Sequence, residues 1–118
     1  MPTKVLVAED DHTMVQLLHT LLKMEGFEVS TLDMNADITS ELLRVKPGFL
    51  FMDVHLGSQS GIAILDSIRI IPEFASLKII MTSGMDMREQ CMRHGADYFI
   101  LKPFMPDDLL SLLKDTPG

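Results

Sequence analysis

Residues 49–61, FLFMDVHLGSQSG, decide the fold because they join an apolar run to a carboxylate and then to small, turn-forming residues. The run FLFM has the composition of a buried strand, and Asp53 follows it directly. An ionised carboxylate that is buried alone costs several kcal/mol or more. Asp53 is therefore expected either to reach solvent at a strand end or to have a charged partner.

The length and composition predict one domain, residues 1–118, around one hydrophobic core, because 47% of the 118 residues are hydrophobic. No window approaches 18 apolar residues and the start has no secretory signal, so we expect a soluble, cytoplasmic protein that is not in a membrane. Cys91 is the only cysteine, which excludes an intramolecular disulfide. The net charge of −7 and the scattered basic residues argue against direct nucleic-acid binding.

Apolar runs alternate with segments of helical spacing along the whole chain. The runs are residues 4–8, 27–32, 49–52, 78–82 and 98–101. The helical segments are an apolar stripe over 14–22 that ends at Gly26, a segment over 38–45 stopped by Pro47 and Gly48, a segment over 62–69 that ends before Pro72, residues 85–94 closed by Gly95, and a segment that begins at Pro106. Such alternation requires right-handed crossovers between parallel strands. It predicts an α/β, doubly wound, five-stranded parallel sheet of the flavodoxin-like type, with strand order 2-1-3-4-5.

Polar residues follow four of the five predicted strands, at the edge of the sheet where such folds place their functional groups. They are Glu9, Asp10 and Asp11 after the first strand, Asp53 after the third, Thr82 and Ser83 after the fourth, and Lys102 after the fifth. Three carboxylates within a few ångströms repel one another unless a metal or a basic side chain offsets their charge. Oxygen ligands alone favour Mg²⁺, Mn²⁺ or Ca²⁺ over zinc. The edge is thus predicted to bind a divalent cation and a phosphoryl group.

Each of these residues also has a structural interpretation. Asp11 or Thr13 could cap the first helix, Thr82 could be an ordinary β-branched strand residue, and Lys102 could be a solvated charge before a proline.

Four segments resemble the receiver domain of two-component response regulators, of the chemotaxis-regulator type. They are VLVAEDD, FLFMDVHLGSQSG, IIMTSG and GADYFILKPF, and they occur in order over residues 4 to about 113. The resemblance implies that Asp53 accepts a phosphoryl group from the phosphohistidine of a sensor kinase or from a small acyl phosphate. It also implies Mg²⁺, with Mn²⁺ as a substitute, held by Asp10, by Glu9 through water, by Asp53 and by the backbone carbonyl of His55.

The resemblance extends to a switch. Thr82 would hydrogen-bond the phosphoryl group and Lys102 would pair with it. Thr82 would then vacate space that the Phe99 ring fills, which would change the surface of the fourth helix, fifth strand and fifth helix. The Lys102–Pro103 bond is expected to be cis. The domain would not be an enzyme, although it takes part in its own phosphorylation and dephosphorylation. Its expected partners are a sensor histidine kinase or phosphotransfer protein and an effector or output domain, with a phosphorylation-dependent homodimer as a further expectation.

This chain departs from the family pattern near the acceptor. Gly57 stands where the family often has proline, so the loop after Asp53 is expected to be more mobile. His55 and Gly84 flank the path of an attacking water. We expect Gly84 to leave that path open and His55 to shield or orient the water, which leaves the lifetime of the phosphoryl group open.

Three rival functions remain to be tested. A flavodoxin-like cofactor binder needs a phosphate-cradling loop after the first strand, where this chain has AEDDHT. An aspartyl-nucleophile phosphatase needs an Asp-x-Asp arrangement there. A receiver fold that binds partners without phosphate would be expected to lose one of the matched residues. The end of the chain, LLKDTPG, leaves open whether this is a stand-alone regulator or part of a longer protein, with residues 116–118 as the start of a linker.

Overall fold

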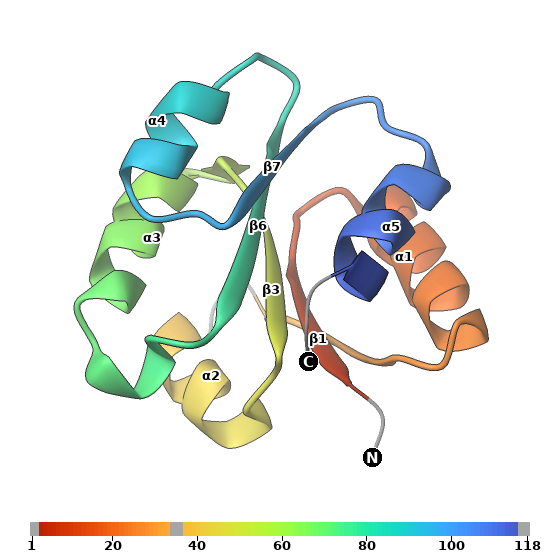
Figure 1. Ribbon diagram of the computed structural model, residues 1–118, viewed down its shortest axis with the longest axis horizontal. Helices are drawn as coiled ribbons and strands as arrows, with labels where there is room; N and C mark the ends of the chain where they lie inside the picture. Colours follow the sequence, from red (N-terminus) through yellow and green to blue (C-terminus); the bar gives the residue numbers. More distant parts are fainter. Residues whose placement is uncertain (1–2, 34–36, 116–118) are drawn as a thin grey trace.

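The computed structural model describes residues 3–33 and 37–115 and shows a five-stranded sheet between two layers of helices (Figure 1). The terminal segment 116–118 lies outside the described residues. The strands are β1 (Lys4–Ala8), β2 (Glu28–Thr31), β3 (Phe49–Asp53), β6 (Lys78–Ser83) and β7 (Tyr98–Leu101). They pair in parallel in the order β2-β1-β3-β6-β7. The predicted order 2-1-3-4-5 is confirmed, because β4 and β5 belong to a separate hairpin.

Helices cover both faces of the sheet. Helices α1 (His12–Met24) and α5 (Pro106–Asp115) lie on one face, and α2 (Ile38–Val45), α3 (Gly61–Arg69) and α4 (Arg88–Arg93) lie on the other (Figure 1). A short 3₁₀ helix, η1 (Pro72–Phe74), follows α3. Within the residues that the structure describes, no helix is long and apolar enough to cross a bilayer.

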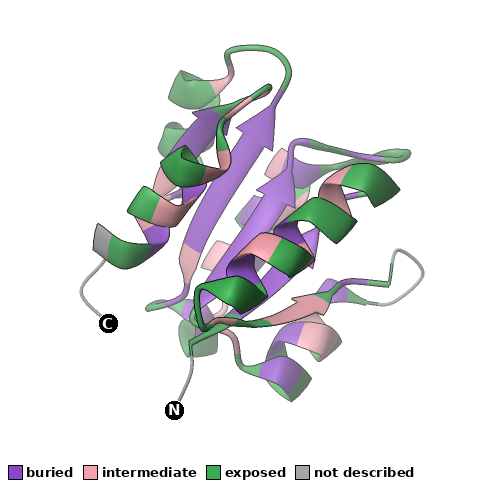
Figure 2. Ribbon diagram, turned by 90° about the vertical axis from the view of Figure 1, so that its right-hand side faces the viewer, coloured by how far each residue is buried: buried purple, intermediate pink, exposed green. Residues whose placement is uncertain are grey.

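The core consists of two layers that share the sheet. Along β1, Val5 and Val7 pack with the residues of α1 and α5, whereas Leu6 and Ala8 pack with those of α2, α3 and α4. This division follows from the alternation of side chains along a strand. The three central strands are buried along almost their whole length (Figure 2), as expected for parallel strands covered on both faces.

Most predicted boundaries are confirmed, but α4 is shorter than the predicted segment 85–94. The helix begins only at Arg88. The Ser83 hydroxyl accepts the N–H of Met85 at 3.1 Å, and the Asp86 carboxylate accepts the N–H of Arg88 at 3.2 Å. These side chains bind the backbone groups locally, so the chain forms a turn where helical spacing alone predicts a helix.

The segment after Asp53 is a hairpin in which β4 (His55–Leu56) pairs antiparallel with β5 (Gln59–Ser60). Gly57 occupies its turn with φ of +59°, a left-handed conformation that glycine adopts without the steric cost of a Cβ atom. The sequence predicts a loop here, and the structure shows that two short strands frame it.

Candidate functional site

The site lies at the carboxyl edge of the sheet, where the register of the strands brings the predicted residues together. Asp53 ends β3 and is the pairing partner of Thr82 on β6. Glu9 follows β1, whose last residue pairs with the residue before Asp53. Lys102 follows β7, and its backbone N–H donates to the carbonyl of Ser83 at 2.8 Å. Four segments distant in the sequence therefore converge on one point.

Lys102 binds two buried carboxylates, and we call these three residues the Lys102 cluster. The ammonium Nζ donates to Asp53 Oδ2 at 2.5 Å and to Glu9 Oε2 at 2.7 Å. The residues Glu9 and Asp53 are only 3% and 6% exposed. The second oxygen of each carboxylate also has a donor, because Asp53 Oδ1 accepts the N–H of His55 at 2.8 Å and Glu9 Oε1 accepts that of Asp11 at 3.2 Å. Asp53 can thus be buried at a strand end because it has a charged partner.

The Lys102 cluster carries more negative than positive charge. Burial raises the pKa of the Glu9 carboxyl, the hydrogen bond from Lys102 opposes this rise, and the nearby charge of Asp53 adds to it, with a net rise. Burial alone would lower the pKa of Lys102, but the hydrogen bonds and charges of Asp53 and Glu9 outweigh it and raise that pKa. The ammonium therefore stays charged at neutral pH, and the cluster holds one basic group for two acidic groups.

Asp10 lies at the same edge but outside the Lys102 cluster. Its Oδ2 accepts the N–H of Gly57 at 2.9 Å, so it joins the end of β1 to the hairpin that follows Asp53. The predicted grouping of three carboxylates is not found: over residues 3–33 and 37–115, no three Asp, Glu, His or Cys side chains are placed to hold a metal together. Lys102 binds Glu9 and Asp53, and the exposed Asp10 points to the hairpin instead.

The oxygen atoms at this edge nevertheless fit a Mg²⁺ ion. Such an ion is usually held by one or two carboxylates and keeps several waters, so it needs no cluster of three acids. Asp10 and Asp53 supply two carboxylates, and both bind N–H groups of the segment after β3, at His55 and Gly57. The donor set consists of oxygen atoms only, as a hard cation prefers.

Asp11 has the structural role that the sequence left as an alternative. Its carboxylate accepts the N–H groups of Thr13 and Met14 at 3.0 and 3.3 Å, so it is the N-cap of α1. Asp11 thus contributes its backbone N–H to Glu9 and its side chain to the helix.

Thr82 and Phe99 both lie in the buried part of the site. The Thr82 hydroxyl donates to the carbonyl of Ile100 at 2.7 Å, and the whole residue is buried. The ring of Phe99, the residue before Ile100, is also buried, with 4% exposure. The Lys102–Pro103 bond is cis, which confirms the expectation from the sequence.

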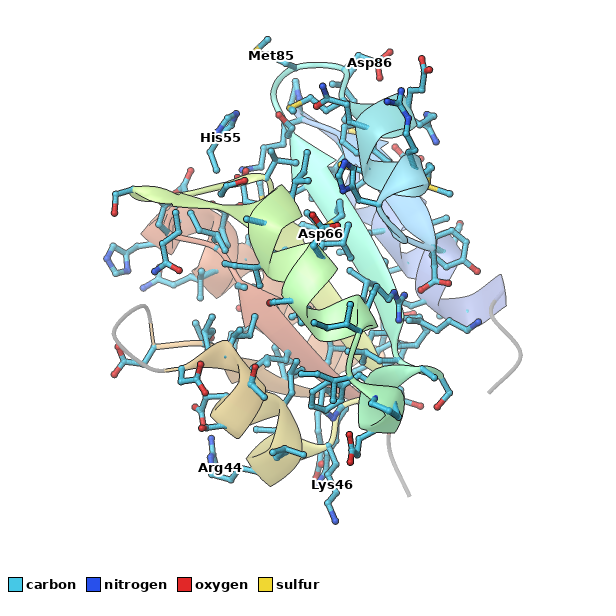
Figure 3. All side chains as sticks on the ribbon, turned by 90° about the vertical axis from the view of Figure 1, so that its left-hand side faces the viewer. Arg44, Lys46, His55, Asp66, Met85 and Asp86 are labelled. Atoms are coloured by element: carbon cyan, nitrogen blue, oxygen red, sulfur yellow. The ribbon has the colours of Figure 1, made fainter. Side chains whose placement is uncertain are left out.

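His55 and Gly84 follow the ends of the neighbouring strands β3 and β6. The His55 side chain projects away from the hairpin into solvent (Figure 3). A Cβ atom added at Gly84 would meet no atom within 4 Å, so this position is open. Their predicted influence on an attacking water remains a prediction.

Gly61 is a residue of this site to which the sequence reasoning gave no role. A Cβ atom there would lie 2.3 Å from the carbonyl oxygen of Asp53 and 2.8 Å from the Cα atom of Val54. Only glycine allows α3 to start this close to the acceptor strand. Its N–H donates to the carbonyl of Val54 at 2.6 Å, which fixes the backbone next to Asp53. The available signal was the glycine that closes the stretch FLFMDVHLGSQSG.

Comparison with known sequences gives a match over almost the whole chain. The sequence model described as the response regulator receiver domain matches residues 5–114. The phosphate regulon transcriptional regulatory protein PhoB of Rhizobium meliloti is 32% identical over 117 residues, which is 97% of this chain and 52% of that protein. The chain spans about half the length of the curated relatives it matches.

Solved structures show the same architecture. The signal receiver domain of a response regulator from Bermanella marisrubri superposes with a TM-score of 0.85 at 25% identity, over 98% of both chains. The chemotaxis response regulator CheY4 of Vibrio cholerae gives a TM-score of 0.86 at 23% identity, over 97% of this chain and 98% of that one. The second likeness shows the shared fold.

Proposed function

Because the chain belongs to the response regulator receiver domain family of two-component systems, we propose that Asp53 is its phosphoacceptor. The donor is the phosphohistidine of a sensor kinase or phosphotransfer protein, or a small acyl phosphate. The observation that carries this proposal is the contact of the Lys102 ammonium with Asp53 in a buried, acid-rich cluster. It supports a role for Asp53 beyond structure, because a merely structural pair does not need the second carboxylate of Glu9.

The chemistry is a phosphoryl transfer to a carboxylate. An oxygen of Asp53 attacks phosphorus, an O–P bond forms, and the bond from phosphorus to the donor nitrogen or oxygen breaks, with the electron pair leaving on the donor. Lys102 stays beside the acceptor and pairs with a phosphoryl oxygen, while the Thr82 hydroxyl hydrogen-bonds another. Little other covalent chemistry is required of the protein.

Asp10, Asp53 and the backbone carbonyl of His55 would hold Mg²⁺, or Mn²⁺ in its place, with Glu9 acting through water. The bound ion would neutralise charge on the transferred group. Asp10 is suited to this role because its carboxylate is exposed and is bonded only to the hairpin N–H among the described contacts.

The domain acts as a signalling module and not as an enzyme, although it takes part in its own phosphorylation and dephosphorylation. Phosphorylation changes the surface of α4, β7 and α5, which then binds an effector or output domain or a second copy of the chain. Relatives named as transcriptional regulators are about twice as long as this chain, which supports an output beyond the receiver. The net charge of −7 favours protein partners over direct contact with nucleic acid. We place this activity in the cytoplasm.

Beryllofluoride with Mg²⁺, observed by two-dimensional NMR, tests the proposal. Beryllofluoride binds as a phosphoryl mimic, so the amide signals around Asp53, Thr82 and Lys102 should shift only when both reagents are present. The variant Asp53→Asn should show no such shift. Unchanged wild-type spectra would contradict the proposal, whereas flavin absorbance or turnover of a free phosphate ester would support its rivals.

The rate of dephosphorylation is a separate part of the proposal. We expect His55→Ala to change the decay of the phosphorylated protein, because His55 is exposed beside the acceptor, while Gly84 leaves the water path open. Decay can be followed by intact mass after removal of the phosphodonor. Identical decay in the wild type and the variant would remove His55 from the mechanism.

A further inference from the structure

Arg88, the first residue of α4, lies over the ring of Phe99 on β7. Its guanidinium carbon is 5.5 Å from the ring centroid. A guanidinium within about 6 Å of an aromatic face is attracted by the ring electrons, and the attraction is about 0.5–1 kcal/mol at exposed sites. The contact therefore joins the start of α4 to a buried ring of the sheet.

The Phe99 ring is directly connected to the acceptor edge. It packs in the same core layer as Met81, Cys91 and Ala96, and it precedes Ile100, whose carbonyl accepts the Thr82 hydroxyl. Arg88 thus covers the ring from the helix side, while Thr82 is bonded to the next peptide unit of β7. One short segment of β7 touches both the proposed phosphoryl-binding hydroxyl and α4.

The position of Arg88 is set by the loop before α4 and by the first turn of that helix. Met85 and Asp86 form the tip of the preceding loop (Figure 3), and the helix has no N-cap side chain. The Asp86 carboxylate accepts the N–H of Arg88, which fixes the backbone at this residue. A basic side chain in the first turn gains nothing from the helix dipole. The ring of Phe99 supplies the favourable contact that the helix terminus does not.

We propose that Arg88 is a positioning residue that holds the Phe99 ring buried before any phosphoryl group arrives. The ring is already buried while the Thr82 hydroxyl still donates to the Ile100 carbonyl. Phosphorylation then needs no entry of the ring into the core, and the change at the surface of α4, β7 and α5 begins when Thr82 exchanges that carbonyl for a phosphoryl oxygen. This inference rests on the proposed function, because it describes the state of the domain that receives the group.

The proposal has a measurable thermodynamic consequence. If the buried ring belongs to the state that binds the phosphoryl mimic, loss of the Arg88 contact reduces the population of that state. The apparent dissociation constant then rises in proportion to the lost population. An interaction of about 0.5–1 kcal/mol changes the ratio of buried to exposed ring about two- to fivefold, which is the upper limit of the weakening of binding.

The test compares Arg88→Met with Arg93→Met, a matched control on the same helix. Arg93 pairs with Glu89 at the surface, and their side chains are 65% and 89% exposed. For both variants we would measure the dissociation constant of beryllofluoride with Mg²⁺ by NMR titration. In the free proteins we would also measure the nuclear Overhauser contacts of the Phe99 ring with Met81 and Cys91.

We expect Arg88→Met to weaken binding measurably, by up to about fivefold, and to reduce the ring contacts, and Arg93→Met to change neither. In a Phe99→Leu background, Arg88→Met should have no further effect, because leucine has no aromatic face. Ring contacts and affinity that are unchanged in Arg88→Met would overturn the inference. Failure of the wild type to bind beryllofluoride would instead contradict the proposed function, while the ring contacts in the free protein would still decide the role of Arg88.

Discussion

Strand β7 has an ion pair at each end, and the two pairs differ in their balance of charge. Asp97 precedes the strand, and its Oδ2 accepts a hydrogen bond from Nη2 of Arg69 at 2.7 Å. The other donors of Arg69 bind backbone carbonyls of Gly95, Phe74 and Leu77, and Asp97 also accepts the N–H of Ile79. This Arg69 network has one cation for one anion, and all of these groups are bonded to protein atoms.

At the other end of β7, the Lys102 cluster has one cation for two buried carboxylates. The Arg69 network joins α3, η1 and the starts of β6 and β7. Its one positive charge balances its one negative charge. The Lys102 cluster has one ammonium for two carboxyl groups, and this imbalance is what the proposed metal binding and phosphoryl transfer would use. If Asp53 accepts a phosphoryl group as proposed, the comparison teaches that the Arg69 network serves the stability of the fold, while the Lys102 cluster gives up some stability for chemistry.

Removal of Arg69 should have the largest effect. In Arg69→Met, Asp97 and three backbone carbonyls lose the hydrogen bonds that Arg69 donates, and breaking such a pair costs about 3 kcal/mol when its groups are mostly buried. Urea unfolding at pH 7 measures the loss. Arg93→Met removes an exposed pair and should leave the unfolding free energy unchanged within error. Equal unfolding free energies of wild type and Arg69→Met would contradict a stabilising role of the Arg69 network.

Removal of Lys102 should have a smaller effect, because burial already raises the pKa of Glu9 and its carboxylate can respond by binding a proton. We expect Lys102→Met to lose about 2 kcal/mol of unfolding free energy at pH 7. The pKa of Lys102 is raised above 10.5 in the folded protein, so its contribution is present below pH 10.5 and is lost as the pH rises through the folded value. The difference between wild type and variant should therefore shrink in strongly alkaline solution. A difference that grows there would contradict this assignment.

Removal of the second carboxylate of the Lys102 cluster, that of Glu9, should stabilise the protein slightly. Glu9→Gln removes a charge whose burial is unfavourable and which also repels Asp53, and we expect a gain of about 1 kcal/mol at pH 7. The folded pKa of Glu9 is raised above 4.5, so its unfavourable charge is present above the folded value and absent below pH 4.5. Thermal unfolding of wild type and Glu9→Gln at pH 7 and below pH 4.5 should show the gain in stability only at pH 7. A lower stability of Glu9→Gln than of wild type at pH 7 would mean that the Glu9 carboxylate stabilises the folded protein, which contradicts this assignment.

The fold was predictable because its signals are local and repeated. Apolar runs separated by helical segments specify the five strands, and the central position of 49–52 follows from its lack of polar residues. The start of α4 was not predictable from spacing, because Ser83 and Asp86 bind the backbone where a helical turn would otherwise form. The hairpin after Asp53 was also missed, since its two strands have only two residues each.

The membership of the site was predictable, but its pairing was not. The sequence places Glu9, Asp53 and Lys102 at strand ends, and parallel pairing brings them to one edge. Which acids the ammonium binds depends on side-chain packing, so the separation of Asp10 from the cluster required the structure. The structure was also required to explain Gly61, where a glycine is needed because the start of α3 lies close to the backbone of Asp53.

The central claim is that Asp53 is the residue that accepts a phosphoryl group. The most direct test is intact-mass spectrometry of the protein after incubation with acetyl phosphate and Mg²⁺, followed by peptide mapping. The account predicts one added phosphoryl group on Asp53 in the wild type, none without the metal, and none in Asp53→Asn. A protein that gains no mass, or that carries the group on another residue, would contradict it.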